Sequence, residues 1–577
     1  MIENQPIGYV VGGGLKESFR VRLTVDPLTV QEGAFVVIES GDYHFYGLVT
    51  DMQLGATDDR FADEKSDRLP AALAKALHGQ TLYTNLEVLP ALMLERGPDP
   101  ASPEYDIWVK KIGDSVPHPI PVKTVPPHHS QVRMANEGDI AEIFGDPNEA
   151  GKFIIGYTRE QGHPVCIDME KFVQRSSGVF GATGTGKSFL TRLVLAGLMH
   201  YNKASVLVLD MHNEYGFDDV ASDTKKAVTG LKTKFKSKIR VVGLGAGATI
   251  RGQVPDFNLE ISTGDISTAD IETLSRELNL KETTPTTLNA LFGSFKNEWF
   301  ARFKAMNREE VEVEDDPFDG AQGRKGKMKR VPHPDSVAAW ADSNGVNIMA
   351  AEALHDKLRR LFGKPYIVEK PAADSVKNII DALENGQHVV LSYGEHESDL
   401  DYLLVSNLLT RKIRAAWEKK TNEFRTHGTS TGSVFEPRPL VIVVEEAHKL
   451  LNREMAAQTT FATIARELRK YYVTLLIVDQ RPSQIYDEVM SQLGTRISGW
   501  LGDDLDIQAV LSGLSGRDAL RGMLARLQPK EEVLLLGWGV PMPLPVKSRR
   551  YDDAFWKELL GNGAKKSEAQ NLKELGF

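Results

Sequence analysis

The feature that most constrains the fold of this chain is a glycine-rich segment at residues 181–188, which reads Gly-Ala-Thr-Gly-Thr-Gly-Lys-Ser. It matches the phosphate-binding loop pattern G-x-x-x-x-G-K-[ST] at every defined position. Apolar residues 178–180 come directly before it, and an amphipathic run, residues 189–199, comes directly after it. The sequence therefore predicts a strand, a phosphate loop and a helix, in the order in which backbone N–H groups can surround a phosphate.

The side chains of this loop predict a nucleotide site with ATP and Mg²⁺ as cofactors. Lys187 would reach the β- and γ-phosphates, and the Ser188 hydroxyl would bind Mg²⁺. The other predicted nucleotide-binding residues are Gly181, Thr183, Gly184, Thr185, Gly186 and Phe189.

A second signal is a pair of acidic residues, Glu445 and Glu446, at the end of the apolar run 440–444. Open α/β folds bind ligands at the carboxyl ends of their parallel strands. We expect Glu445 to approach Mg²⁺, either directly or through its shell of ligands, and Glu446 to polarise the attacking water as a general base. The alternative is two solvated acids at a helix start, where the helix dipole favours negative charge.

A third signal follows the apolar run 474–478. Gln480 would lie at the same sheet edge as Glu446, where its amide would sense the γ-phosphate or orient the water. The alternative is an ordinary polar residue at a strand end.

Basic residues supply candidates for an arginine that stabilises charge on a neighbouring subunit's nucleotide. Arg466 and Arg469 lie three positions apart in a helix predicted over residues 456–471, and so share one face. The alternative is a basic exposed helix face. Arg175 and Arg496 are weaker candidates for the same role.

Another acidic element follows the apolar run 205–209. Asp210 and Glu214 come near the same predicted edge, where they would help to hold Mg²⁺, its waters or a neighbouring loop. We interpret His212 as structural.

The chain divides into segments of different periodicity. Short strands with period-2 alternation fill the beginning, apolar strands alternate with amphipathic helices from about residue 165, and helical periodicity alone occupies the middle of that region. The predicted organisation is a small β-barrel or sandwich at 1–130, a linker at 131–164, an α/β core at 165–265 and 363–545, a helical insertion at 266–362, and a C-terminal tail at 546–577.

Some local predictions are finer. A helix is expected at 69–77, and surface loops are expected at 419–438 and where the acidic run 309–316 precedes the basic run 324–330. The apolar run 388–391 lies between the two nucleotide motifs in the sequence. We interpret it as an extra strand, which together with a separate catalytic glutamate is typical of additional-strand P-loop proteins.

Composition excludes several classes of protein. The apolar runs are far too short to cross a bilayer, and the single cysteine, Cys166, excludes an intrachain disulfide and a multi-cysteine zinc site. A cytoplasmic protein without membrane attachment is expected. The net charge of −10 argues against a protein that simply coats DNA, but it is compatible with a ring that has an acidic outside and a basic bore.

Together these residues resemble the HerA family of hexameric DNA translocases and helicases, in its bacterial type, within the HerA–FtsK group of P-loop ATPases. Four pieces carry the resemblance in order along about 165–545. They are the loop at 181–188, the element at 210–215, the run Val-Val-Glu-Glu-Ala-His-Lys-Leu at 443–450, and residues 464–483.

The resemblance implies a fold and partners. The fold would be an α/β, RecA-like additional-strand core, a parallel sheet with helices on both faces, with an N-terminal β-barrel similar to that of ATP synthase subunits and an inserted helical bundle. The assembly would be a homo-hexamer with ATP between subunits and double-stranded DNA in its channel. A partner nuclease of the NurA type would act with it in DNA end resection and repair.

The resemblance also implies roles for single residues. Glu446 would activate water, Gln480 would act as the sensor, and Arg469 would be the arginine finger. The tail at 546–577 would brace a neighbouring subunit. The chain departs from the family pattern at two positions. Leu468 stands where a glycine is expected, and leucine favours a continuous helix there. Glu445 stands where aspartate is frequent.

A different class of protein fits the same nucleotide motifs. The alternative is an ATP-gated hexameric scaffold of an antiphage defence complex, with an effector nuclease or NADase. A conjugation or chromosome-segregation pump is disfavoured because the sequence has no candidate transmembrane segment.

Overall fold

The computed structural model describes residues 5–57, 82–98, 102–112, 117–220, 225–314, 328–431, 435–456 and 459–561. The chain forms two compact units. The first unit combines Met1–Tyr201 with Leu476–Phe577, and the second is Asn202–Leu475. No helix in the described ranges is both long and apolar enough to cross a membrane.

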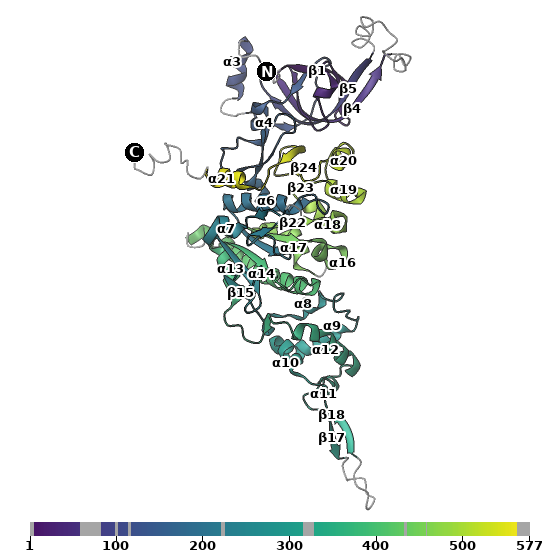
Figure 1. Ribbon diagram of the computed structural model, residues 1–577, viewed down its shortest axis with the longest axis vertical. Helices are drawn as coiled ribbons and strands as arrows, with labels where there is room; N and C mark the ends of the chain where they lie inside the picture. Colours follow the sequence, from purple (N-terminus) through teal and green to yellow (C-terminus); the bar gives the residue numbers. More distant parts are fainter. Residues whose placement is uncertain are drawn as a thin grey trace, which may run out of the picture. The chain divides into compact units, whose positions relative to one another are not determined.

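The N-terminal part of the first unit is a β-barrel (Figure 1). Its described strands form a seven-stranded sheet in the order β2-β1-β7-β3-β4-β5-β6, and pairing of β2 with β5 closes it. In β2, Phe19, Val21 and Leu23 are buried inside the barrel, as period-2 alternation predicts. The strands are β1 (Pro6–Gly13), β2 (Phe19–Leu23), β3 (Phe35–Ser40), β4 (Tyr43–Ala56), β5 (Leu82–Glu95), β6 (Ile120–Pro121) and β7 (Gln131–Met134).

The predicted barrel is therefore confirmed. The sequence did not indicate helix α3 (Pro103–Ile112), which lies between β5 and β6. The helix predicted at 69–77 lies outside the described residues.

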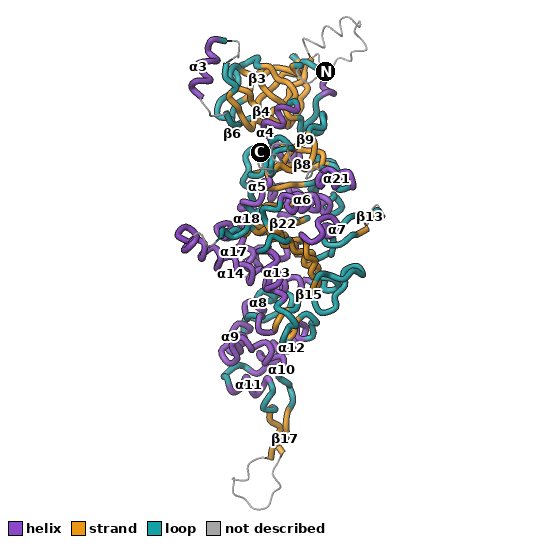
Figure 2. Tube along the Cα trace, turned by 90° about the vertical axis from the view of Figure 1, so that its left-hand side faces the viewer, coloured by secondary structure: helices purple, strands orange, loops and turns teal. Residues whose placement is uncertain are grey.

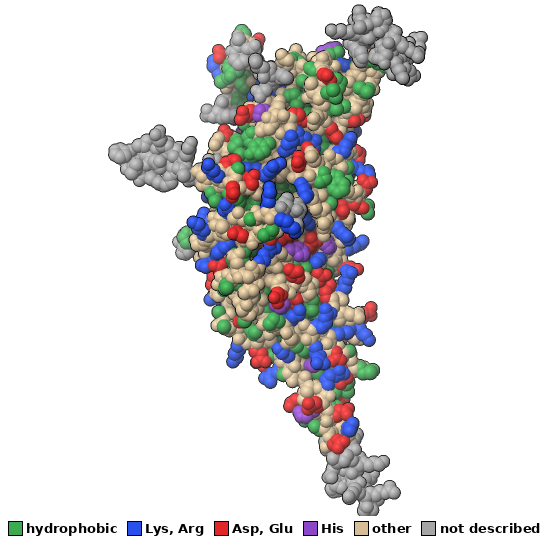
Figure 3. All heavy atoms as spheres, in the orientation of Figure 1, with side chains coloured by type: hydrophobic (Ala, Val, Ile, Leu, Met, Phe, Trp, Pro, Cys, Tyr) green, Lys and Arg blue, Asp and Glu red, His purple; other side chains and the backbone are tan. Residues whose placement is uncertain are grey.

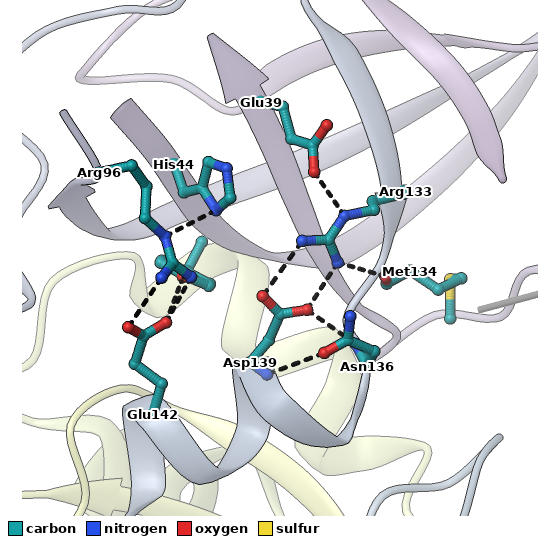
Figure 4. Close-up of polar contacts among 9 residues, drawn as sticks. Glu39, His44, Arg96, Arg133, Met134, Asn136, Asp139 and Glu142 are labelled. Atoms are coloured by element: carbon teal, nitrogen blue, oxygen red, sulfur yellow. Dashed lines mark hydrogen bonds and ion pairs between the residues drawn. The ribbon is translucent and has the colours of Figure 1, made fainter. Parts of the chain in front are cut away.

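The segment predicted as a linker, residues 131–164, is instead regular structure. It contains barrel strand β7, helix α4 (Glu137–Phe144) and core strand β8 (Lys152–Tyr157), and it ends at β9 (Pro164–Asp168). Figure 4 shows the reason: Arg133 of β7 donates to the buried carboxylate of Asp139 at 2.6 Å, and Asp139 also completes the capping box of α4 with Asn136. The same guanidinium donates to Glu39, 94 positions away, at 2.7 Å. Such pairing between distant residues leaves no trace in the periodicity of the sequence, so this prediction was wrong.

The core sheet of the first unit surrounds β10 (Ser177–Phe180), which pairs in parallel with β22 on one side and β23 (Thr495–Ser498) on the other. The order runs β22-β10-β23-β24-β25-β8-β9. The strands beyond β23 are antiparallel, so the sheet is mixed and not purely parallel. The added strands are β24 (Glu532–Gly537) and β25 (Leu544–Ser548).

Helices cover this sheet (Figure 2). The helix after the phosphate loop, α6, is almost entirely buried from Leu190 to Met199. The helices are α5 (Met169–Gln174), α6 (Lys187–Tyr201), α18 (Asp487–Gln492), α19 (Asp504–Leu511), α20 (Arg517–Ala525) and α21 (Asp553–Gly561).

The second unit contains the parallel strands in the order β15-β14-β20-β11-β21. They are β11 (Ser205–Asp210), β14 (Ile239–Leu244), β15 (Phe257–Leu259), β20 (His388–Ser392) and β21 (Leu440–Glu445). The chain leaves the unit within β22 (Val473–Asp479). Apolar runs predicted at these strands are confirmed, whereas β14 and β15 were missed.

One prediction about the strand order was wrong. β20, interpreted as the extra strand between the nucleotide motifs, pairs with β11 and β14. The additional strand beside the strand of the phosphate loop is β22, which pairs with β10. The position of a strand in the sequence does not give its position in a sheet.

The predicted helical insertion is confirmed (Figure 1). Its described helices are α8 (Thr268–Glu272), α9 (Thr284–Phe295), α10 (Trp299–Ala305), α11 (Val337–Ser343) and α12 (Ile348–Phe362). The rings of Trp299, Phe300, Phe303 and Phe362 contact one another in its core. The insertion also carries an antiparallel hairpin, β17 (Glu310–Glu314) with β18 (Met328–Pro332).

Two predicted surface loops are therefore regular in part. Residues 310–314 of the acidic run pair with residues 328–332 as the β17–β18 hairpin, in which Arg330 faces Glu312, while residues 315–327 lie outside the described part. Residues 419–431 belong to the 33-residue helix α14 (Asp399–Thr431), because Trp417 and Thr421 are buried on one side of it and its polar residues cover the other. Polar composition alone suggested a loop.

Short elements complete the second unit. They are β12 (Asp219–Val220), β13 (Ala227–Val228), α7 (Leu231–Phe235), β16 (Ile261–Ser262), β19 (Ile367–Val368), α13 (Ser375–Glu384), α15 (His448–Leu451), α16 (Arg453–Ala456) and α17 (Thr460–Glu467). On the molecular face drawn in Figure 3, acidic and basic side chains are interspersed.

Candidate nucleotide site

The phosphate loop lies in the first unit, between β10 and α6, as the sequence predicts. Gly184 has φ 78° and Gly186 has φ 91°, left-handed values that glycine adopts without steric cost. A Cβ atom added to Gly181 would lie 2.8 Å from the Thr185 hydroxyl oxygen. The backbone therefore has the curled form that a phosphate cradle requires, and the donor set fits a nucleotide.

The phosphate loop is held by one hydrogen bond within the loop and one to a distant segment of the same unit. The Thr185 hydroxyl donates to Ala182 O at 2.7 Å, and the Ala182 N–H donates to Trp500 O at 3.0 Å. Lys187 and Ser188 begin α6 and are partly exposed, as is Phe189. A rigid loop with accessible side chains at the helix start can bind a phosphate without reorganising.

The loop contacts the residue predicted as the sensor. The Thr183 hydroxyl donates to the Gln480 amide oxygen at 2.5 Å, although the two residues lie 297 positions apart. Gln480 directly follows β22, and the buried carboxylate of Asp479 accepts the Arg481 N–H at 2.7 Å. The structure thus brings Thr183 and Gln480 together at the carboxyl ends of β10 and β22.

The acidic residues lie in the second unit, at the end of β21. Glu445 is buried, and its Oε1 accepts a hydrogen bond from the Tyr215 hydroxyl at 2.7 Å. Its backbone carbonyl accepts the Tyr402 hydroxyl at 2.7 Å. Burial, and then the neighbouring Glu445 carboxylate, raise the pKa of Tyr215 well above its usual range, so this hydroxyl stays protonated and keeps donating.

Glu446 has the most informative backbone of the acidic residues in the second unit. Its φ is 43°, a left-handed value that a residue with a Cβ atom adopts at a cost of about 1 kcal/mol. Its side chain is largely buried, with Oε2 3.6 Å from His448 Nδ1, and its carbonyl accepts the Lys449 N–H at 2.8 Å. Strained residues of this kind collect at functional sites. A simple solvated acid would not need such a position.

His448 was not singled out in the sequence. Its spacing of two residues from Glu446, at the start of α15, was the available signal. An imidazole at this distance, when protonated, would attract the carboxylate and favour its orientation.

Asp210 has a structural role in the turn that follows β11. Its carboxylate accepts the N–H groups of Glu214 at 2.8 Å and Tyr215 at 3.0 Å, and the Ser392 hydroxyl donates to it at 3.3 Å. The side chain is fully buried. Of the roles considered for Asp210, holding a neighbouring loop is the one that these contacts support.

The side chains of the two weaker arginine candidates make contacts within the first unit. The guanidinium of Arg175 lies 4.2 Å from the centre of the Trp538 ring. That of Arg496 is buried and donates to the carbonyls of Met490 and Ser512 at 2.8 Å and 2.7 Å. Burial lowers the pKa of Arg496 to about 10. Both therefore stabilise their own subunit.

The two stronger candidates have a described backbone only. Arg466 lies near the end of α17 and Arg469 lies in the 3-10 turn η6 (Leu468–Tyr471), while both side chains fall outside the described part. The expectation that Leu468 continues the α-helix was wrong, because α17 ends at Glu467 and the chain tightens into η6. A turn before β22 therefore presents Arg469.

Within the described ranges, no group of three or more His, Cys, Asp or Glu side chains is placed to hold a metal ion. Mg²⁺ in nucleotide enzymes takes most of its ligands from phosphates and water, with one or two from the protein. The Ser188 hydroxyl suits that pattern as a protein ligand, and bound Mg²⁺ would neutralise phosphate charge.

Comparisons with known proteins agree on one family. Residues 151–413 match the family model described as "Helicase HerA, central domain". The chain is 24% identical to the DNA double-strand break repair helicase HerA of Sulfurisphaera tokodaii, over 95% of this chain and 93% of the relative. It is 22% identical to the protein of the same name from Saccharolobus solfataricus, over 96% and 94%.

Similarity to solved structures is weaker. The bacterial conjugative coupling protein TrwBdeltaN70 aligns with 72% of this chain and 92% of its own at 13% identity, with a TM-score of 0.43, and we draw nothing further from it. The family model covers the phosphate loop, and the curated relatives extend over nearly the whole chain. The family model and the curated relatives together support a HerA-family protein, a P-loop ATPase.

Proposed function

We propose that this protein is an ATP-driven translocase or helicase on double-stranded DNA, working as a homo-hexamer with ATP between subunits. The observation that carries the proposal is the hydrogen bond between Thr183 and Gln480. It joins the phosphate loop to the end of β22, the strand that directly follows the turn containing Arg469. A change at the γ-phosphate can therefore reach the segment that would act on a neighbouring subunit.

The chemistry of hydrolysis needs few groups. Lys187 would bind the β- and γ-phosphates, and the hydroxyl of Ser188, at the start of α6, would bind Mg²⁺. Glu446 accepts a proton from the attacking water, and Gln480 orients that water or senses the γ-phosphate. Arg469 stabilises the charge that develops on the phosphoryl group of a neighbouring subunit, with Arg466 as the second candidate.

Glu445 has a different role in this proposal. Its buried position and its bond to Tyr215 hold the end of β21 in place. The carboxylate would then be available to Mg²⁺, either directly or through the ligands around the ion.

Double-stranded DNA is proposed as the substrate because both relatives described above are named as DNA double-strand break repair helicases. A partner nuclease of the NurA type in DNA end resection belongs to the same proposal. A translocase must bind the DNA phosphates at every position along the duplex. Its affinity for DNA should therefore fall steeply as the salt concentration rises and depend little on the base sequence.

The direct test is ATPase activity of the purified chain with and without linear duplex DNA, together with a mass measurement of the assembly. A hexamer whose turnover rises on addition of DNA supports the proposal. A hexamer with turnover indifferent to DNA indicates the ATP-gated scaffold, and a monomer without ATP affinity overturns both.

The arginine role has a separate test. Subunits with Arg469→Ala and subunits with Glu446→Gln are each expected to be inactive alone. When they are mixed, some interfaces combine an intact Glu446 with an intact Arg469, and partial ATPase should return. Absence of any recovery in verified mixed assemblies would place Arg469 outside the neighbour's site, and the Arg466→Ala mixture would then be the next comparison.

A further inference from the structure

A second lysine lies against the phosphate loop. Lys530 belongs to the turn between α20 and β24, and its N–H donates to Thr185 O at 3.1 Å. A Cβ atom added to Gly186 would lie 3.4 Å from Lys530 Cα and 3.8 Å from both Cβ and Cγ. The aliphatic stem of Lys530 therefore runs along Gly186, the residue that precedes Lys187.

The backbone of Lys530 is strained. Its φ is 68°, a left-handed value that is unfavourable for a residue with a Cβ atom. The residue is exposed, so burial of its side chain in the core does not offset this cost. Strain of this kind persists where the surroundings fix it, and it is frequent where a ligand is bound.

The surroundings do fix this turn. The Arg159 guanidinium contacts the Glu532 carboxylate at 2.8 Å, and both side chains are mostly buried. Trp500 connects the loop to the helix before the turn, because its carbonyl accepts the Ala182 N–H at 3.0 Å and its indole N–H donates to Ala525 O at 2.9 Å. Loop and turn therefore form one rigid element of the first unit.

We propose that Lys530 binds the phosphates of the nucleotide held by the loop of its own subunit, as a second cation beside Lys187. This inference rests on the proposed function, since it requires a nucleoside triphosphate at the loop. Three bonds separate Cγ from the ammonium, which places the ammonium within reach of a phosphate held at Gly186. A triphosphate carries more charge than one ammonium neutralises, so a second cation increases affinity most for ATP.

The test compares nucleotide affinities of purified full-length variants. Lys530→Asn removes the ammonium, and asparagine tolerates the left-handed backbone. We expect ATP affinity to fall by about 5- to 10-fold, ADP affinity to fall less and AMP affinity to stay unchanged, since an exposed ion pair contributes modestly. Lys530→Arg keeps the charge and should bind ATP within about 2-fold of the parent.

The chain offers a matched control. Lys225 is also an exposed lysine with a left-handed φ of 55°, and it belongs to the other unit. Lys225→Asn should bind ATP like the parent. If Lys530→Asn lowers the unfolding temperature, Lys530→Gly, which adopts this backbone freely, replaces it in the titrations.

Two outcomes overturn the inference. In the first, the parent binds ATP and Lys530→Asn binds it equally well. The inference then fails, and the proposed function stands. The other is an equal loss for ATP and AMP, which would indicate a structural role only. A parent without any ATP affinity would overturn the proposed function together with this inference.

Discussion

The phosphate loop and the acidic turn after β21 offer different groups to a ligand. The loop offers backbone N–H groups, and it is held both by a local bond from Thr185 to Ala182 and by a distant one from Ala182 to Trp500. The acidic turn depends on side chains from distant segments, since Glu445 bonds Tyr215 across 230 positions. Binding a phosphate needs converging N–H groups, whereas placing one carboxylate for proton transfer needs support from the surrounding fold.

The backbone conformations of the loop and of the acidic turn also differ. Gly184 and Gly186 adopt left-handed values without cost because they have no Cβ atom. Glu446 adopts φ 43° although it has one. The turn keeps a carboxylate at a position that glycine would occupy with less strain, which suggests that the carboxylate itself is required there.

The largest expected effect comes from the loop. Lys187→Ala removes the cation that binds the β- and γ-phosphates, so ATP affinity should fall at least about 100-fold with turnover lost. Titration with ATP measures it, and Lys171→Ala, at an exposed lysine of α5, is the control. Near-normal ATP binding by Lys187→Ala would mean that the loop is not the nucleotide site.

A mutation in the acidic turn should change the free energy of unfolding. Tyr215→Phe removes a buried hydrogen bond to a carboxylate, at a cost of about 1–3 kcal/mol in the free energy of unfolding. Because folding raises the pKa of Tyr215, its contribution is fully present below the usual tyrosine pKa and is lost as the pH rises beyond it.

Urea unfolding of the parent and of Tyr215→Phe at neutral pH and in the alkaline range measures this effect. The parent should lose more stability than the variant as the pH rises above about 10. Identical alkaline slopes would contradict the assigned bond.

Thr183→Ala tests the contact between the loop and Gln480. Loss of one hydrogen bond should lower the ATP turnover rate by about 3- to 10-fold, with little change in unfolding temperature. Thr183→Ser keeps the hydroxyl and should retain most of the rate. If the alanine variant turns over at the parental rate, Gln480 does not report on the nucleotide through this bond.

The smallest expected effect concerns the backbone strain at Glu446. Glu446→Gly should leave the free energy of unfolding unchanged or raise it by up to about 1 kcal/mol, because glycine adopts the left-handed backbone freely while its unfolded chain is more flexible. Hydrolysis should stop in the same variant. A loss of several kcal/mol would show that the carboxylate stabilises the fold.

The sequence predicted the parts that depend on local patterns. The loop, the strands β10, β11, β20, β21 and β22, the barrel and the helical insertion follow from periodicity and from one glycine-rich motif. Three features depend on pairing and burial between distant residues, such as Arg133 with Glu39 and Trp417 in the core. They are the spatial position of β20, the structured segment at 131–164 and the continuation of α14.

The same distinction applies to the site. Thr183 and Gln480 were each named from their own motif, but their contact required the fold. Tyr215 beside Glu445 and Lys530 beside Gly186 were not anticipated, since no spacing rule connects them. The two-residue spacing of His448 from Glu446 was visible in the sequence but was not used.

The central claim is that a triphosphate bound at the loop is hydrolysed with Glu446 as the base. The most direct measurement is the identity of the nucleotide that remains bound after incubation with ATP, determined by chromatography of the denatured protein. Glu446→Gln should hold ATP, with binding within about 3-fold of the parent, whereas the parent should hold ADP. ADP bound to Glu446→Gln in the same proportion and at the same rate as in the parent would contradict the account.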